Sequence, residues 1–480
     1  MKLTYSKLFY LIMAGGVVFR LLFILVLGKY YFGRDNFFFD HDTGTWAIAI
    51  YNLMEHGEFT SDLSREMGYF MRMPGYSFFM YPFYLITGHD WWAAIKVIGW
   101  FQTILDIFNV WFVYKLGRKL SPGNERIALI FSALYAFYPF IVVWNPVCYS
   151  ELMAISIMLY SLWFIAGKPG LKEMFFSGLI MGLSVLFRPQ ISLLIPAAII
   201  SFVIFNYGIL NIKKSLLPLS IFTLGVCCSY GLWPARNYIN HGKLIFSQNL
   251  TGINQWNSDV MEFRQFIYSI KAEWEPQFTQ IISNKPVTYP ANGLLNPRDS
   301  LDLIRAFALS KECGYGFSYW SGYWKKNVSA TEDCSSEIAG IYKRLRLKQA
   351  TENPWNYYIK VPLQNIKKAL FKFSLNDSAS TARKFASLLF VFRTLLIFFG
   401  LAGFFLMLKE SKPEVKTIAG MCLLYFLALY IYLCFGTGDQ CRNIEMRYFL
   451  PADVLLLIPA AWLFDRIACL KERKKLPHSN

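Results

Sequence analysis

The chain has 480 residues, of which 55% are hydrophobic, 18% are aromatic and only 16% are charged. Soluble domains usually contain about 25% charged residues, so this composition excludes an ordinary water-soluble protein and indicates a membrane protein. The formal net charge of +17 does not indicate nucleic-acid binding, because the basic residues gather in short links between apolar runs.

About ten apolar segments approach the length that a helix needs to cross a bilayer. They are residues 8–27, 92–114, 126–144, 151–166, 174–187, 191–205, 216–233, 385–407, 418–435 and 448–464. The chain is therefore predicted to be an all-α polytopic membrane protein with about ten transmembrane helices. Segments 174–187 and 191–205 are short and flank Arg188-Pro189, so they form either two spans that meet at one face or one interrupted hairpin.

The distribution of basic residues predicts the orientation of these helices. With the N-terminus in the cytoplasm, every strongly basic link falls on the cytoplasmic side, as the positive-inside rule requires. These links contain Arg118 and Lys119, Lys168 and Lys172, Lys213 and Lys214, Lys409, Lys412 and Lys416, and the basic stretch 471–475. The loops 28–91, 145–150, 188–190, 234–384 and 436–447 then face the outside.

Three regions follow from this topology. Residues 1–233 form an N-terminal transmembrane catalytic module with the outer loop 28–91, residues 234–384 form a small extracytoplasmic domain, and residues 385–480 form C-terminal transmembrane helices with a basic cytoplasmic tail. Within the outer loop, the short aromatic-rich segment 76–87 is predicted to be an interfacial helix. In the extracytoplasmic domain, helices are predicted over 301–311 and 335–350, and Cys313 and Cys334 can pair as a disulfide in an oxidising compartment.

Two acids in the first outer loop are candidates for proton transfer. Asp40 and Asp42 flank His41 at the predicted membrane surface, where partial desolvation is expected to raise a carboxylate pKa and make it a better base. The alternative is that Asp42 is a solvated loop acid or a helix N-cap. A metal site formed by these three consecutive residues is a weaker alternative, because neighbours in sequence rarely converge on one ion.

Arginines and a further acid lie at the same predicted face. Arg72, Arg188, Arg236 and Arg447 each have a proline or an aromatic residue within two positions, and a guanidinium binds phosphate oxygens in bidentate fashion. The alternative for any single arginine is snorkelling towards lipid headgroups. Glu151 is either a first-turn acid that interacts with the helix dipole or a second acid that faces the pocket. Asp106, inside a predicted span, is assigned a structural hydrogen bond.

The ordered motifs resemble the protein mannosyltransferase and aminoarabinose transferase group of the C-type integral membrane glycosyltransferases. The resemblance rests on Asp42, Trp46 and Ala47, on Arg72-Met73-Pro74-Gly75-Tyr76, on Ser150-Glu151, on Arg188-Pro189, on Trp233-Pro234-Ala235-Arg236-Asn237-Tyr238 and on Arg447-Tyr448-Phe449-Leu450-Pro451. The chain departs from the family pattern in having Trp46 for the more usual Tyr and Leu232 for the Pro that usually precedes the tryptophan.

The resemblance implies an inverting glycosyltransferase that moves a sugar from a polyprenyl-phosphate donor to a glycan, lipid or protein acceptor on the outer, periplasmic face of a cell inner membrane. Asp42 is then the general base, with Asp40 in reserve and Glu151 as a further candidate. Arg72, Arg188, Arg236 and Arg447 bind the donor phosphate, and Trp46, Tyr76 and Asn237 contact substrate. This chemistry needs no nucleotide pocket, and a divalent cation stays an open alternative, because some relatives use one and others do not. Two alternatives are an O-antigen-type polymerase or ligase and a non-enzymatic lipid or glycan transporter.

Overall fold

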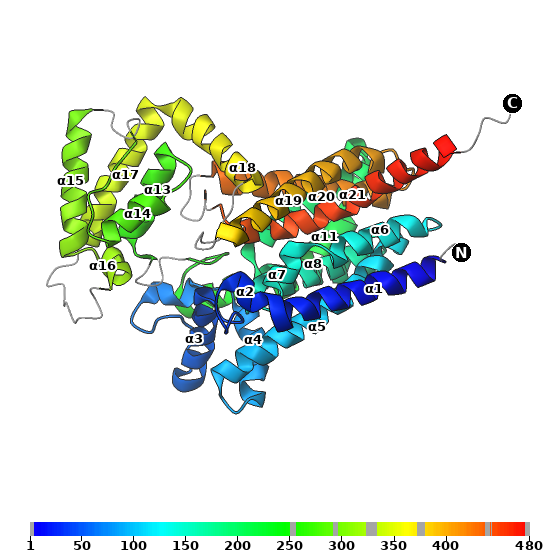
Figure 1. The fold of residues 1–480 in the computed structure, drawn as a ribbon, viewed down its shortest axis with the longest axis horizontal. Helices are drawn as coiled ribbons and strands as arrows, with labels where there is room; N and C mark the ends of the chain where they lie inside the picture. The colour runs from blue at the N-terminus through cyan, green and yellow to red at the C-terminus, as the bar shows by residue number, and fades with distance from the viewer. Residues whose placement is uncertain are drawn as a thin grey trace.

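A bundle of long helices carries a smaller helical domain at one end, and both described chain ends lie at the other end (Figure 1). The structure, a computed structural model, describes residues 4–249, 256–290, 296–322, 334–371, 380–436, 442 and 444–475. Within these ranges every regular element is helical, and the predicted all-α class is confirmed.

The N-terminal part of the chain forms most of the bundle and the outer loop. Its helices are α1 (Tyr5–Leu22), α2 (Gly28–Phe32), α3 (His41–His56), α4 (Pro74–Ile86), α5 (Trp91–Leu120), α6 (Glu125–Ala136), α7 (Pro139–Trp144), α8 (Ser150–Ile165), α9 (Leu171–Phe187), α10 (Leu194–Phe202), α11 (Ile212–Ser229) and α12 (Leu232–His241). The remaining helices are α13 (Ser258–Ile270), α14 (Glu275–Ile282), α15 (Pro297–Glu312), α16 (Tyr315–Ser321), α17 (Ser335–Glu352), α18 (Val361–Phe371), α19 (Ser380–Met407), α20 (Pro413–Phe435) and α21 (Met446–Lys475).

Six helical stretches of the described chain are long and apolar enough to cross a membrane. They are Tyr5–Phe32, Trp91–Leu120, Pro189–Tyr207, Ile212–Ser229, Leu388–Met407 and Pro413–Phe435, and Ser150–Ile165 is a shorter apolar helix. Helices also occupy the other segments predicted to span, so all ten predicted segments are helical. For those outside the six, membrane crossing stays a prediction.

Prolines explain two interruptions of the bundle. Pro139 splits the predicted segment 126–144 into α6 and α7, because the residue before a proline is driven out of the helical conformation. Arg188 is extended before Pro189 for the same reason and ends α9. Beyond this break, α9 packs on α8 and α11, whereas α10 packs on α20. The structure therefore has two separate helices that meet at Arg188.

A buried ion pair joins α1 to α5 in the middle of the bundle. Arg20 Nε lies 2.7 Å from Asp106 Oδ2, and both side chains are fully buried. Tyr135 OH donates to the other carboxylate oxygen at 2.7 Å, and Asn145 Nδ2 donates to Oδ2 at 3.1 Å. Each Asp106 oxygen is thus hydrogen-bonded, which supports the structural role assigned to this residue.

We expect Asp106→Ala to lower the free energy of unfolding in detergent by about 3–5 kcal/mol, because Arg20 would be left buried without its partner. The double variant Arg20→Leu/Asp106→Leu removes both charges and should recover most of that loss. Thermal unfolding of the purified proteins measures both effects. An Asp106→Ala protein with an unchanged melting temperature would contradict the assigned role.

A second buried ion pair fixes the position of α21, which carries Arg447 in its first turn. Arg393 on α19 contacts Asp453 on α21 at 2.6 and 3.1 Å, and Tyr138 at the start of α7 donates to Asp453 at 3.0 Å. These contacts join the N-terminal and C-terminal parts of the bundle beneath the first turn of α21.

The smaller helical domain, which contains α13 to α17, has a hydrophobic core of its own. Its buried residues come from α13 to α17 and are separate from the core of the bundle. The predicted helices 301–311 and 335–350 correspond to α15 and α17. Cys313 and Cys334 form a disulfide between the end of α15 and the start of α17.

Arg442 connects this part to the bundle. Its buried guanidinium donates to the carbonyl oxygens of Tyr268 on α13 at 2.7 Å and of Tyr357, ahead of α18, at 2.8 Å. Asn365 on α18 also donates to the carbonyl oxygen of Cys434 on α20 at 3.2 Å. These contacts hold α13 over the outer end of the helices.

Candidate active site

A cavity of about 270 Å³ lies at the junction between the bundle and the smaller helical domain. Its walls come from α3, the residues just before α4, the break after α9, helices α13 and α14, and the first turn of α21. It includes Asp42, Arg72, Arg188 and Arg447, which are four of the predicted site residues.

Local sequence explains how Arg72 reaches this cavity. Pro74 occupies the first turn of α4, where its missing N–H costs nothing. A Cβ atom on Gly75 would lie only 2.7 Å from the carbonyl oxygen of Leu186, so the glycine allows α4 to start directly against the end of α9. Arg72 and Arg188 are thereby brought to the same wall.

Asp42 lies between two arginines. Its Oδ1 is 2.8 Å from Arg72 Nη2 and its Oδ2 is 2.7 Å from Arg447 Nη2. Arg72 Nε also donates to Thr45 Oγ1 at 2.8 Å, one turn further along α3. Asp42 belongs to the first turn of α3, and its carboxylate pairs with the two guanidinium groups. A role as a simple helix cap, the alternative for Asp42, does not account for these contacts.

The environment of Asp42 corrects the expected direction of its pKa shift. Burial by itself would raise the pKa, but the charges and hydrogen bonds of Arg447 and Arg72 outweigh it and hold the pKa well below the ordinary carboxylate value. The expectation from the sequence rests on desolvation alone, because the sequence of the loop reveals neither of the two ion pairs. Asp42 is therefore fully ionised near neutral pH.

Glu151 continues the ion network beneath the cavity. It lies in the first turn of α8 and is only 1% exposed. Its Oε1 is 3.0 Å from Arg188 Nη1 and 3.8 Å from Arg447 Nε, and Arg447 Nε also contacts Glu445 Oε2 at 2.7 Å. Both alternatives for Glu151 are partly met, since it is a first-turn acid whose charge faces the arginines of the site.

Other predicted residues lie outside this cavity. Asp40 is 3.6 Å from Arg34. Arg236 donates to the carbonyl oxygens of Phe59 at 3.0 Å and Tyr69 at 3.2 Å, so it holds the outer loop against α12. Asn237 is fully buried and donates to a backbone carbonyl.

The two predicted aromatic residues have different positions. Trp46 lines the cavity, and the guanidinium carbon of Arg72 lies 4.5 Å from the centre of its ring. Tyr76 is buried behind Trp46, with ring centres 5.1 Å apart, and donates to Gln102 Oε1 at 2.8 Å. Tyr76 thus supports the tryptophan that faces the cavity.

Sequence reasoning did not find the residues that the smaller helical domain contributes. Arg264 on α13 lines the cavity, is 2% exposed, and lies 5.6 Å from the ring centre of Trp256 and 5.5 Å from that of Trp274. Among the described residues, its Nε and Nη2 have no hydrogen-bond partner. The sequence does contain a signal that Arg264 is buried, because this arginine shares the apolar face of α13 with the buried Val260 and Ile267.

Within the part of the chain that the structure describes, no group of three or more His, Cys, Asp and Glu side chains gathers. The two acids of the first loop are turned to different arginines. The weak alternative of a metal site around His41, whose side chain lies outside the described part, has no support from the described contacts.

A family model described as dolichyl-phosphate-mannose-protein mannosyltransferase matches residues 72–233. The predicted family resemblance is confirmed. The match to this mannosyltransferase family begins at Arg72 and includes Ser150, Glu151 and Arg188, whereas Asp42 and Arg447 lie beyond its ends. A search of curated proteins found no significant match.

Two solved structures are compared with this chain by their alignment. The oligosaccharyltransferase of Archaeoglobus fulgidus in the apo form aligns with a TM-score of 0.50 and 13% identity, over 98% of this chain and 52% of that one. The chain therefore spans about half the length of that enzyme. ArnT from Cupriavidus metallidurans aligns with a TM-score of 0.33 and 14% identity, over 95% of this chain and 80% of that one. The likeness to the archaeal enzyme is one of fold.

Proposed function

We propose that this protein is a glycosyltransferase that moves a sugar from a polyprenyl-phosphate donor to an acceptor hydroxyl at the outer face of the membrane. The observation that most directly supports this proposal is the position of the ionised Asp42, which lies between Arg72 and Arg447 in the cavity between the bundle and the smaller helical domain. A base beside two phosphate-binding groups is the arrangement that this reaction requires. The match to the mannosyltransferase family supports the same reaction class.

The reaction needs one bond formed and one broken at the anomeric carbon. The acceptor oxygen attacks that carbon as its proton passes to Asp42, and the bond to the phosphate oxygen breaks, so that polyprenyl phosphate leaves with the bonding electrons. The arginines stabilise the negative charge that grows on the phosphate. Direct attack from the opposite face inverts the configuration. Glu151 is buried and paired to Arg188, which leaves Asp42 as the base.

Donor binding would also activate Asp42. In the structure its carboxylate is paired with Arg72 and Arg447, which makes it a weak base. A donor phosphate that shares these two guanidinium groups would weaken both ion pairs and raise the pKa of Asp42. The carboxylate would then accept a proton more readily when a donor is present, and unproductive proton uptake would be avoided in its absence.

We assign the acceptor, or the sugar being transferred, to the side of the cavity formed by Trp256, Arg264 and Trp274. The flat faces of tryptophan contact sugar rings, and a buried arginine with unpaired N–H groups can bind hydroxyl or anionic oxygens. The donor phosphate would lie on the opposite wall, near Arg72, Arg188 and Arg447. This division places the anomeric carbon near Asp42.

Arg264→Ala is expected to lower kcat/KM roughly 10–100-fold, because a charge-assisted hydrogen bond to substrate is lost. The melting temperature should change little, because the lost ring contacts with Trp256 and Trp274 are offset by the removal of two buried N–H groups without hydrogen-bond partners. Steady-state transfer and thermal unfolding of the same preparations measure the two effects. If the variant transfers normally but melts earlier, Arg264 is structural.

The direct test is transfer by membranes that contain the wild-type protein. Radiolabelled polyprenyl-phosphate sugars are supplied, and label is followed into water-soluble or acceptor-bound product. We expect product only when the protein is present. Binding of the donor without turnover would instead favour a transporter. Transfer of a preassembled glycan from a lipid diphosphate, with no use of monophosphate donors, would favour a polymerase or ligase.

The outer orientation and a location in a cell inner membrane belong to the same proposal. The helix ends that line the cavity face the smaller helical domain, and the link between α5 and α6, which is one of the basic links, lies at the other end of the bundle with both described chain ends (Figure 1). The positive-inside rule assigns that other end to the cytoplasm. Cysteine labelling of an exposed loop residue in intact cells can test the assignment.

A further inference from the structure

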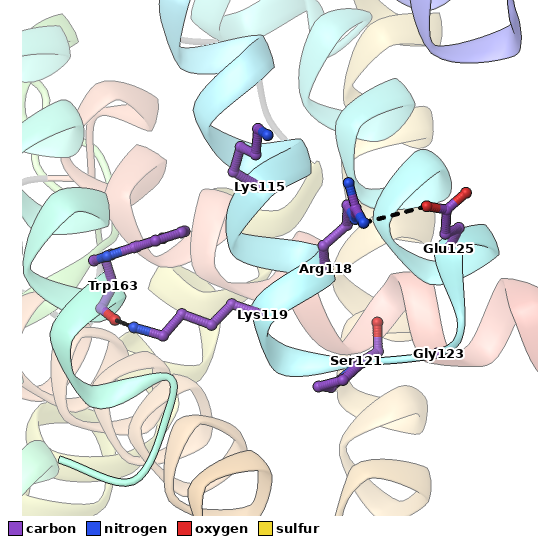
Figure 2. Close-up of a pocket in the computed structure, with 8 residues that line it drawn as sticks. Lys115, Arg118, Lys119, Ser121, Gly123, Glu125 and Trp163 are labelled. Atoms are coloured by element: carbon purple, nitrogen blue, oxygen red, sulfur yellow. Dashed lines mark hydrogen bonds and ion pairs between the residues drawn. The ribbon is translucent and has the colours of Figure 1, made fainter. Parts of the chain in front are cut away.

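A second cavity lies at the end of the bundle opposite Asp42. It has a volume of about 460 Å³ and is formed by the last turns of α5, the loop to α6 and the end of α8 (Figure 2). Lys115, Arg118 and Lys119 contribute three positive charges, and Glu125 contributes one negative charge. The lining therefore carries a net charge of +2.

The cations are held in place around this cavity. Lys119 Nζ donates to the carbonyl oxygen of Trp163 at 2.6 Å, which satisfies one of the last carbonyl groups of α8. Arg118 Nη2 lies 3.5 Å from Glu125 Oε1. Among the residues that the structure describes, no carboxylate pairs with Lys115 (Figure 2). Its ammonium group is therefore available to an anionic ligand.

An apolar groove adjoins the basic cavity. Its volume is about 510 Å³, and it shares Lys115 and Trp163 with that cavity. The rest of its lining is aromatic and consists of Phe108, Trp111, Phe112 and Tyr160. Phe108 precedes Arg118 by ten positions on α5, so the groove extends about 15 Å from the basic end towards the middle of the helix. Phe108 and Trp111 are 46% and 38% exposed, as expected of a surface that faces lipid.

We propose that the basic cavity and the adjoining groove together bind one anionic phospholipid. The phosphate would contact Lys115 and Arg118, with Lys119 close by, and an acyl chain would lie along Phe108, Trp111 and Phe112. A net positive cavity favours a headgroup with net negative charge over a zwitterionic one, and basic pockets between membrane helices bind such headgroups. This site is separate from the Asp42 cavity and does not depend on the proposed transfer reaction.

Native mass spectrometry of the full-length protein in detergent tests the proposal. Dioleoyl phosphatidylglycerol and dioleoyl phosphatidylcholine are added in equal amounts, and bound lipid is counted for each protein. Wild type should retain phosphatidylglycerol preferentially, and Lys115→Gln/Arg118→Gln should lose about tenfold or more of that affinity, because two phosphate contacts disappear. This variant keeps the bond between Lys119 and Trp163, so the end of α8 is preserved.

The matched control is Lys168→Gln/Lys172→Gln, which removes one exposed charge from the loop between α8 and α9 and one from the first turn of α9 without touching the cavity. It should bind phosphatidylglycerol as the wild type does. Phe108→Ala/Trp111→Ala should weaken binding of the long-chain lipid. The proposal is overturned if wild type shows no preference for phosphatidylglycerol, if the control loses as much affinity as the test variant, or if sn-glycerol 3-phosphate alone binds as tightly as the lipid.

Discussion

Asp42→Asn is expected to lower sugar transfer roughly 10³-fold, in the middle of the range for loss of a general base. The amide is nearly the same size as the carboxylate but cannot accept the proton of the acceptor hydroxyl, and its single oxygen can accept a hydrogen bond from only one of Arg72 and Arg447. The other guanidinium stays available to the donor phosphate, so donor binding and membrane insertion should be retained. Radiolabel transfer measures turnover, and filter binding of the donor measures affinity.

Asp40→Asn is the matched control for this variant, because it makes the same chemical change two residues away. Asp40 is partly exposed and lies 3.6 Å from Arg34 rather than in the cavity, and an exposed ion pair contributes little. Its activity should stay within about threefold of wild type. Asp42→Glu should retain part of the activity, since the carboxylate is kept but displaced. The opposite result, with Asp40→Asn inactive and Asp42→Asn active, would move the base to Asp40.

Arg447→Gln is expected to lower kcat roughly 10²–10³-fold, the cost of removing one preorganised group that stabilises transition-state charge. Arg447 contacts Asp42, Glu151 and Glu445, so this arginine connects the base with the rest of the ion network. Single-turnover transfer with saturating donor measures the chemical step. Arg236→Gln is a matched control, because Arg236 binds backbone carbonyls outside the cavity, and its effect should appear in thermal stability rather than in kcat.

Arg447→Gln should also change the pH dependence of kcat/KM. In the wild type the two arginines hold the pKa of Asp42 well below the ordinary value, so the base is ionised across the neutral range and activity falls only in strong acid. Without Arg447, only Arg72 still lowers the pKa of Asp42 against the effect of burial, so the pKa rises. The acid limb should therefore move to higher pH. An acid limb that does not move would contradict the role of Asp42 as the titrating base.

The sequence by itself determined the class of protein and the location of most helices. Apolar length, prolines and glycines act locally, so their effects can be read from a short window. The ten predicted segments are all helical, and the role of Asp106 agrees with its contacts. The break at Arg188 was expected from Pro189. The loop acids and arginines were identified because charged residues beside apolar spans are costly and therefore informative.

Only the tertiary structure decided which of these charges act together. Asp42 and Arg447 are 405 positions apart in the chain and 2.7 Å apart in space, and no local pattern encodes that contact. The ion pairs lower the pKa of Asp42, although desolvation alone would raise it. Arg236 lies in a motif similar to those of the other arginines, but its guanidinium donates hydrogen bonds to backbone carbonyl oxygens outside the cavity. Arg264 completes the cavity from a separate part of the chain. Pairing energies between charges depend on distance and burial, which are properties of the packed molecule rather than of the sequence.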